Sequence, residues 1–545
     1  MSPKMYSRRS FVSNTARMMA GLAAVPLLAA CGGATTTAAP TTAPTTPAKP
    51  TTAAPAAAPT SAPTTAATKG ATTAATTAPT AGVTAGAAAT TAPTAAAAAG
   101  APTVAATATD VPVTRALPTA QKSTAKVTGK WVVLQDQDFN AEHNAYLRKG
   151  IQDFAKTQGW PLDLSYVAGF SAGGSLEQKL AAAVSAGTPP DLMAKDASAY
   201  QLKFLDIIEE MDDITKEMLG KYGDTIPGFK KDKFIDGKWW STPFFTRLGG
   251  RFGRRDIFAE NGLDVEKDTQ DLQKLPDVLL QVSKPDKQMW GWGMTINTCG
   301  DGESLVTDTL LAMGSRLTDE SGQVVKLNSP ETVAAIKWLV NIYTDAKWKN
   351  MLPAGINSWT DPSNNEAWLA GKIAYTSNAG TVYAQTVQQN KPFAKDTTLL
   401  QVPALAGQPK LQGAGGASFF IFKGSKNKEA TKDLIRYLLD PVSQKALWLT
   451  TPGYVLPAYK SGWSDADFRK DQNAVRFEPV AWDPSAFNGI AFPGPNTAAA
   501  SAVSSQNVYT KMAASVLNGK KPEDVVKDAH DQAVKIYKDF GMKGV

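Results

Sequence analysis

One pentapeptide in the sequence matches a catalytic motif. Gly169-Phe170-Ser171-Ala172-Gly173 fits the G-x-S-x-G pattern, in which a serine nucleophile stands on the turn between a strand and a helix. The serine would need an imidazole base, and because His143 precedes it in the chain, His530 would have to serve. Both histidines are expected to lie exposed on charged helices, which argues against a catalytic role for either. A surface serine hydrolase that uses Ser171 and His530 is an alternative function.

Composition argues against most other chemistry. Two cysteines and two histidines among 545 residues cannot build a zinc cluster or a disulfide-stapled scaffold, so no metal site is predicted. The chain has no Gly-Lys-Ser or Gly-Lys-Thr loop, and the cluster from Gly413 to Gly416 lacks dinucleotide spacing, so no cofactor is expected. Basic residues in the first 30 positions supply more than half of the +7 net charge. The remainder is too weakly basic to predict nucleic-acid binding.

The N-terminus is typical of an exported lipoprotein. The apolar run from Met18 to Ala30 is too short to span a bilayer, so residues 1–30 are predicted to be an export signal. Ser7-Arg8-Arg9-Ser10-Phe11-Val12 resembles a twin-arginine export motif, and Leu28-Ala29-Ala30-Cys31 resembles a bacterial lipobox. The second resemblance implies that Cys31 is lipidated and holds the mature chain at the extracytoplasmic face of the cell membrane.

Residues 31–129 are expected to form a disordered tether. The chain from Gly32 to Ala108 consists almost entirely of Thr, Ala and Pro, and no aromatic residue lies between Cys31 and Trp131. A segment without large side chains cannot bury enough apolar surface to offset the entropy of ordering it. A long stalk and an aromatic-rich domain leave a further alternative function, a cell-wall polysaccharide-binding module.

Residues 130–545 contain all 13 tryptophans and are predicted to form an α/β domain. The apolar runs at 131–134 and 162–167 predict strands, and helices are expected at 141–156 and where Leu176, Leu180 and Val184 recur every four residues. Strand, helix, strand, helix in this order favours a parallel sheet covered by helices. About 415 residues exceed the size at which single cores stop growing.

Six segments of the domain resemble, in order, motifs of the extracellular solute-binding proteins of ABC importers, the family that includes maltose-binding protein. The first, AAAVSAGTPPDL, spans Ala181 to Leu192. The other five are Asp236–Pro243, Ser329–Tyr343, Ala367–Ala374, Phe422–Leu447 and Pro452–Pro457. Together they cover nearly all of the domain.

The resemblance implies a periplasmic-binding-protein-like fold, with two α/β lobes that close on a ligand between them. The first lobe would comprise residues 130–242 and 403–450, and the second 243–402 and 451–545. Pro243, Pro403 and Pro457 would lie near the hinge crossovers. The implied function is that of a monomeric, non-enzymatic receptor. It would pass a small polar solute, most plausibly a carbohydrate because of the aromatic content, to an ABC permease.

The resemblance also implies which residues touch the ligand. Polar loops at the carboxyl ends of parallel strands would supply one wall, and residues after Pro243 the opposite wall. Asn378-Ala379-Gly380 matches a family loop that leads into a stacking tryptophan, but Thr381 follows here, so Tyr383 or Trp359 is expected to supply the platform. The expected contacts are Asp136, Asp138, Asn140, Lys195 and Asp196 on one wall, then Phe245, Arg247, Asp301 or Glu303, Asn378, Gly380, Tyr383 and Asn496.

Overall fold

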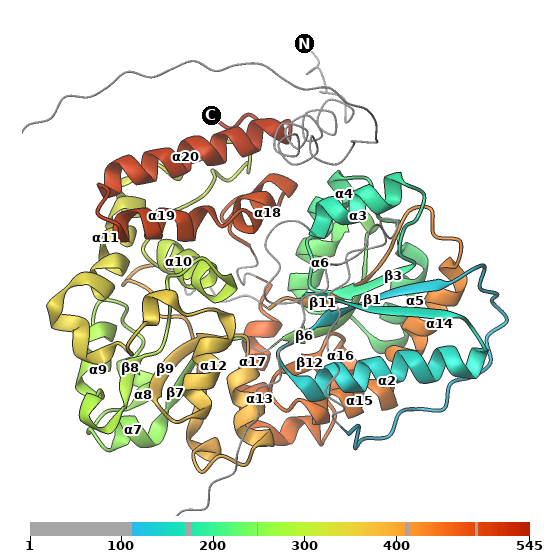
Figure 1. Ribbon diagram of the computed structural model, residues 1–545, viewed down its shortest axis with the longest axis horizontal. Helices are drawn as coiled ribbons and strands as arrows, with labels where there is room; N and C mark the ends of the chain where they lie inside the picture. The colour runs from blue at the N-terminus through green and yellow to red at the C-terminus, as the bar shows by residue number, and fades with distance from the viewer. Residues whose placement is uncertain (1–111, 169–175, 248, 409–413, 485–488) are drawn as a thin grey trace, which may run out of the picture. The chain divides into compact units, whose positions relative to one another are not determined.

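A computed structural model describes residues 112–545 except 169–175, 248, 409–413 and 485–488. The expected export signal, Cys31, most of the tether and Ser171 lie outside the described residues. The described chain is built around a six-stranded and a four-stranded β-sheet, each flanked by helices (Figure 1). We call the parts of the chain around them the first and second lobes.

The six-stranded sheet has the strand order β12-β6-β11-β3-β1-β2. Strands β2, β1 and β3 are parallel, β11 is antiparallel to β3, and β6 is antiparallel to both β11 and β12. The strands are β1 (Trp131–Gln137), β2 (Leu162–Ala168), β3 (Leu192–Lys195), β6 (Thr242–Arg247), β11 (Gly416–Ile421) and β12 (Val455–Pro457). The alternation predicted for residues 131–184 is confirmed.

Helices of the first lobe begin and end where local chemistry dictates. Helix α2 (Ala141–Gln158) begins after Asn140, whose side chain accepts a hydrogen bond from the His143 amide, and ends at Gly159 in the left-handed region, φ 75°. The others are α3 (Leu176–Ser185), α4 (Ala199–Phe204), α5 (Asp212–Tyr222), α6 (Pro227–Lys233), α14 (Lys428–Leu438), α15 (Pro441–Thr450) and α16 (Lys460–Trp463), and α17 (Gln472–Ala481) follows them in the chain. A hairpin of β4 (Phe234–Ile235) and β5 (Lys238–Trp239) follows α6.

The four-stranded sheet has the order β10-β7-β9-β8, and helices α9, α10, α11, α19 and α20 supply much of a second hydrophobic core. Its strands are β7 (Gly250–Arg254), β8 (Trp290–Trp292), β9 (Ile373–Asn378) and β10 (Thr397–Leu400). The helices are α7 (Arg255–Ala259), α8 (Val265–Asp268), α9 (Leu275–Gln281), α10 (Gly300–Ala312), α11 (Pro330–Thr344), α12 (Asp361–Leu369), α13 (Thr381–Gln388), α18 (Ala498–Ser505), α19 (Val508–Leu517) and α20 (Pro522–Asp539).

The chain leaves the first sheet later than the expected boundaries at 243 and 451, whereas the expected boundary at 403 falls between β10 and β11. Strand β6 continues from Thr242 to Arg247, because it pairs with β11 on one side and β12 on the other. Residues 243–247 and 455–457 therefore belong to the first lobe. So does α16, which packs on α5, α15 and β12, whereas α17 contacts β10 of the second sheet through Asn473, which is bonded to Thr397 and Leu399. The crossings lie between β6 and β7, between β10 and β11, and after β12.

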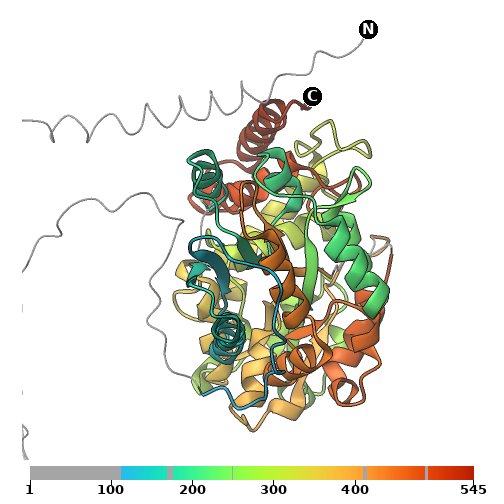
Figure 2. The ribbon, with the colours of Figure 1, turned by 90° about the vertical axis from the view of Figure 1, so that its right-hand side faces the viewer.

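Residues 112–129 form a strap on the outside of the first lobe, shown in blue in Figures 1 and 2. Leu117 packs against the first core, the Thr128 amide donates to Asn427 Oδ1 at 2.8 Å, and the Tyr437 hydroxyl donates to the Pro118 carbonyl at 3.2 Å. The expectation of a disordered tether up to residue 129 is thus wrong for this segment, because it contains apolar side chains that the Thr/Ala/Pro-rich part lacks. Among the helices of the described chain, none is long and apolar enough to cross a membrane.

Candidate ligand-binding site

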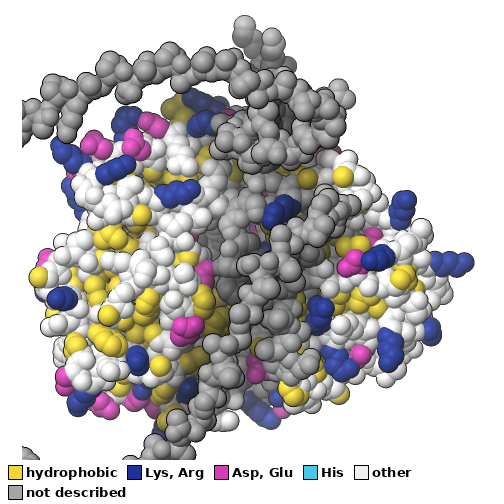
Figure 3. All heavy atoms as spheres, viewed as in Figure 1, with side chains coloured by type: hydrophobic (Ala, Val, Ile, Leu, Met, Phe, Trp, Pro, Cys, Tyr) yellow, Lys and Arg dark blue, Asp and Glu magenta, His cyan; other side chains and the backbone are white. Residues whose placement is uncertain are grey.

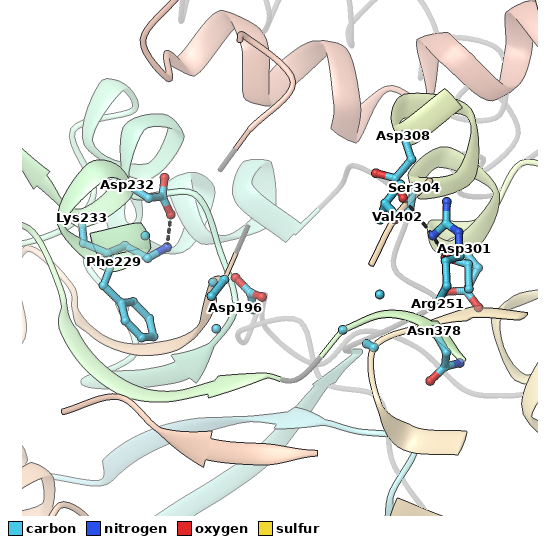
Figure 4. Close-up of a pocket in the computed structure, with 18 residues that line it drawn as sticks. Asp196, Phe229, Asp232, Lys233, Arg251, Asp301, Ser304, Asp308, Asn378 and Val402 are labelled. Carbon is cyan, nitrogen blue, oxygen red and sulfur yellow. Dashed lines mark hydrogen bonds and ion pairs between the residues drawn. The ribbon is translucent and has the colours of Figure 1, made fainter. Parts of the chain in front are cut away.

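A pocket of about 370 Å³ is lined by residues from both lobes (Figure 4). Asp196, Phe229, Asp232 and Lys233 come from the first lobe, where they follow β3 or belong to α6. Those from the second lobe lie on β7, α10 and the end of β9, and include Arg251, Asp301, Ser304, Asp308, Ser377 and Asn378. Glycines at 228, 249, 250, 415 and 416, with Ala379, Val402 and Ala414, complete the lining.

Arg251 organises the second-lobe wall. Strands β7 and β9 pair with Arg251 opposite Ser377, and Arg251 Nη1 donates to Ser377 Oγ at 2.5 Å. The same nitrogen lies 3.0 Å from Asp308 Oδ2 on α10. Burial raises the pKa of Asp308, although the guanidinium opposes this shift. The ion pair therefore joins the sheet to the helix at the edge of the pocket.

Asp301, in the first turn of α10, is held by neutral groups and lies beside another carboxylate. Asn364 Nδ2 donates to Asp301 Oδ2 at 2.7 Å, while the Asp301 amide donates to Asp361 Oδ1 at 2.7 Å. Burial and the negative charge of Asp361 raise the pKa of Asp301 to about 7. A carboxyl group in this setting can change protonation state near neutral pH.

The first-lobe wall buries its cation and exposes its carboxylates. Lys233 Nζ lies 2.5 Å from Asp232 Oδ2 and also donates to the Ala197 carbonyl, and its side chain is only 2% exposed. The Asp196 side chain is 50% exposed and lies 3.3 Å from Arg247 Nη1. Phe229 is the aromatic residue of the pocket lining.

A buried charge cluster links β1, β3, β6 and the loop before β12. Lys195 Nζ lies 2.9 Å from Asp136 Oδ1, and Arg247 Nη2 lies 3.3 Å from both Asp136 Oδ2 and Asp138 Oδ2. The Tyr454 hydroxyl donates to Asp138 Oδ2 at 2.5 Å. Burial acts to raise the pKa of Asp138, but Arg247 and the hydrogen bonds outweigh it, and the pKa is lowered. These groups neutralise one another and hold the strands in register.

Comparison with known proteins accounts for the two-lobed arrangement. Residues 149–475, more than half of the chain, match the family model described as bacterial extracellular solute-binding protein. The chain belongs to this family of bacterial extracellular solute-binding proteins. No curated protein shows a significant match to its sequence. The resemblance seen in the six motifs is thereby confirmed at the level of the family.

Solved structures of solute-binding proteins share the fold. Maltose-bound T. maritima MalE3 is 19% identical over 74% of this chain and 99% of its own, with a TM-score of 0.63. A ribitol complex from Agrobacterium radiobacter K84 is 19% identical over 75% and 98%, with a TM-score of 0.62. A sugar transporter protein from Arthrobacter chlorophenolicus A6 with bound laminaribiose is 17% identical over 74% and 98%, with a TM-score of 0.61. The two-lobe fold is therefore established for this solute-binding protein.

The predicted contact residues divide between the pocket and its supports. Asp196, Asn378 and Asp301 line the pocket, and ligand contact by them remains a prediction. Asp136, Asp138, Lys195 and Arg247 meet in the buried cluster instead. The expectation that Arg247 faces Asp136 across the cleft is wrong, because β6 belongs to the same sheet as β1.

Other predicted contacts occupy structural positions outside the pocket lining. Asn140 caps α2 and donates to Gln388 Oε1 at 2.9 Å, and Phe245 is buried edge-to-face against His143 with ring centroids 5.2 Å apart. Glu303 accepts bonds from the amides of Tyr509 and Thr510 at the start of α19. Gly380 precedes α13 with φ 91°, the Tyr383 hydroxyl donates to Asp471 at 3.2 Å, and Asn496 is half-buried before α18. Neither Tyr383 nor Trp359 lines the pocket as a stacking platform.

The two histidines differ in their surroundings. His143 is 1% exposed rather than exposed as expected, and burial lowers its pKa to about 4. His530 on α20 is half-buried, and its Nδ1 accepts a bond from the Asn328 amide at 3.2 Å. His143 lies on the α2 face that carries Tyr146 and Leu147 into the core, which explains the error.

The sequence predicted Asp301 and Asn378 of the second-lobe wall but not Arg251, Ser304, Asp308 or Ser377. Asp301, Ser304 and Asp308 are spaced three and four residues apart, which places them on one face of α10. This spacing of polar residues is visible in the sequence and indicates a polar face on the helix. No local pattern in the sequence marks Arg251 as a pocket residue, because its partner Ser377 is 126 positions away in the chain.

Proposed function

We propose that this protein is a lipid-anchored extracytoplasmic receptor of an ABC importer that captures a small carbohydrate and delivers it to the permease. The observation that carries the proposal is the pocket whose lining is divided between the two lobes. A ligand that touches both walls favours the closed state, because it gains both sets of contacts only there. Closure would then signal occupancy to the permease.

The pocket lining suits a polyhydroxylated ligand. Carboxylates, the Ser304 and Ser377 hydroxyls and the Asn378 amide offer acceptors and donors that match sugar hydroxyls. A volume of about 370 Å³ is at the small end of the range for ligand pockets, which favours a monosaccharide, a polyol or a short oligosaccharide. The structural relatives named above were solved with maltose, ribitol and laminaribiose, which supports this class.

Membrane attachment is proposed through Cys31, with the chain up to residue 111 as the tether. The family is extracytoplasmic, which agrees with an export signal at residues 1–30. Mass spectrometry of the mature protein should find a diacylglycerol adduct on Cys31, and Cys31→Ser should release the protein from the membrane fraction. Recovery of unlipidated protein from membranes would contradict this part of the proposal.

The binding function is tested by a thermal-shift screen of mono- and disaccharides, polyols, amino acids, polyamines and glycerol phosphates, followed by calorimetry. We expect stabilisation by at least one carbohydrate or polyol. Ser304 is exposed in the pocket, so Ser304→Trp should fill the space and abolish binding without loss of folding. Ser321→Trp, at an exposed position outside the pocket lining, is the matched control. Stabilisation only by non-carbohydrates would overturn the proposed substrate class.

The two alternatives give different results. A serine hydrolase would label at Ser171 with a fluorophosphonate probe, whereas a receptor would not. A cell-wall module would be retained on peptidoglycan or insoluble polysaccharide and would show no closure on any small solute. Small-angle scattering with and without ligand measures that closure directly.

A further inference from the structure

The charges that reach the pocket surface are negative. Side-chain exposure is 50% for Asp196, 28% for Asp232 and 22% for Asp308, but only 2% for Lys233 and 4% for Arg251. Both cations are also satisfied inside the wall, Lys233 by Asp232 and Arg251 by Asp308. A solute that enters the pocket therefore meets carboxylate oxygens.

The carboxylates on the two walls outnumber their cationic partners. Asp301 lines the pocket next to Asp361 and is bonded by the neutral amide of Asn364, while Arg251, the cation that acts on it, is paired with Asp308. On the other side Asp196 shares Arg247 with Asp136 and Asp138, and Lys195 is bonded to Asp136. In a cleft that closes and loses water, like charges without a counter-charge are costly.

We infer that the solute carries a positively charged amino group in addition to its hydroxyls, as an amino sugar or an amino polyol does. This inference rests on the proposed function and narrows its substrate class. The ammonium group supplies the counter-charge that the walls lack, and the hydroxyls are bound by the neutral polar groups Ser304, Ser377 and Asn378. A neutral sugar fills the same space but leaves the carboxylates uncompensated on closure.

Calorimetric titration with matched pairs tests the inference. The pairs are glucose and glucosamine, galactose and galactosamine, mannose and mannosamine, and sorbitol and glucamine, with putrescine as an amine that has no hydroxyls. In 20 mM NaCl we expect the amino member of the best-binding pair to bind at least tenfold more tightly than the neutral member. At 300 mM NaCl this preference should shrink several-fold, because salt screens the charge interaction.

Two variants locate the effect. Asp196→Asn and Asp301→Asn keep the side-chain shape and should each reduce affinity for the amino compound about tenfold. The loss for its neutral partner should be several-fold smaller, because the amide oxygen can still accept a hydrogen bond from a hydroxyl group. Asp236→Asn is the control, since its side chain is 78% exposed and lies outside the pocket lining. Thermal melts of all three variants verify that they fold.

The possible outcomes separate this inference from the proposed function. Equal or tighter binding of the neutral members overturns the amino-group requirement and leaves the carbohydrate receptor intact. Binding of putrescine without response to any hydroxylated compound overturns both, as does the absence of binding to any member of the panel.

Discussion

The guanidinium of Arg247 lies 3.3 Å from the carboxylate of Asp138, which joins the end of β6 to the loop after β1. The Arg247 side chain is 16% exposed and that of Asp138 is 5% exposed, so the pair is largely removed from water. A charge in such a position is stable only while its partner is present. Because Arg247 also pairs with Asp196 of the pocket lining, the cluster supports the pocket wall.

Arg247→Leu should destabilise the protein by about 3–5 kcal/mol, because it leaves Asp136 and Asp138 buried with Lys195 as their remaining cation. Urea denaturation of the two proteins at pH 7 measures the change. Arg436→Leu is the matched control, since its pair with Glu217 lies on the surface and is worth less than about 1 kcal/mol. Equal losses in the two variants would contradict the role given to the cluster.

Asp301 should make the free energy of unfolding fall as pH rises from about 4 to about 7. Its pKa is raised to about 7 in the folded protein, so the native state binds more protons than the unfolded state across this range. Each unit of difference between the pKa values of the folded and unfolded states corresponds to about 1.4 kcal/mol in the free energy of unfolding. Asp301→Asn removes this dependence and should gain stability relative to the wild type on going from pH 4.5 to pH 8 in urea titrations. A constant difference between the two proteins would be inconsistent with the raised pKa.

His143 should remain neutral above about pH 5.5. Its pKa of about 4 lies below the usual value, so the unfolded chain takes up the proton first and stability is lost as pH falls from about 6.5 to about 4. With two histidines in the chain, two sets of imidazole resonances can be followed by NMR, and His143→Gln assigns them. A His143 midpoint near 6.5 would show that the ring is accessible to water.

Leu117 and Gly150 should be energetically coupled. A methyl group at Gly150 would lie 3.3 Å from Leu117 Cδ2 and 3.4 Å from Leu438 Cδ2, so the strap restricts what this position of α2 accepts. Alanine is favoured over glycine inside helices by up to about 1 kcal/mol. Gly150→Ala should therefore be more favourable by about 0.5–1 kcal/mol in the Leu117→Ala background than in the wild type. Additive effects in this double-mutant cycle would mean that the strap does not press on α2.

Much of the fold follows from local signals. The apolar runs and the four-residue spacing between 131 and 184 predict the β1-α2-β2-α3 order, and Ser329-Pro330 marks the start of α11. The expected lobe boundaries at 243 and 451 lie too early in the chain, whereas the one at 403 agrees with the crossing between β10 and β11. Pro243 instead lies inside β6, whose neighbours β11 and β12 come from far along the chain.

The site is less accessible to sequence reasoning than the fold. Asp196 and Asn378 could be placed from the motifs that precede them, because each follows or ends a buried strand. Whether a polar residue lines the pocket or supports it depends on strand order, which set Arg247 beside Asp136 and Arg251 beside Ser377. Such long-range pairings leave no trace in local spacing.

The strap at 112–129 also affects how mechanical load would enter the domain. Thr128 fastens it near its end, Tyr437 bonds Pro118, and its apolar residues lie on the first core, so these bonds of segment 112–129 are made to the first lobe. If Cys31 is lipidated as we propose, tension on the tether would pull the strap from the surface of the first lobe before it reached β1. The second lobe would bear none of this load.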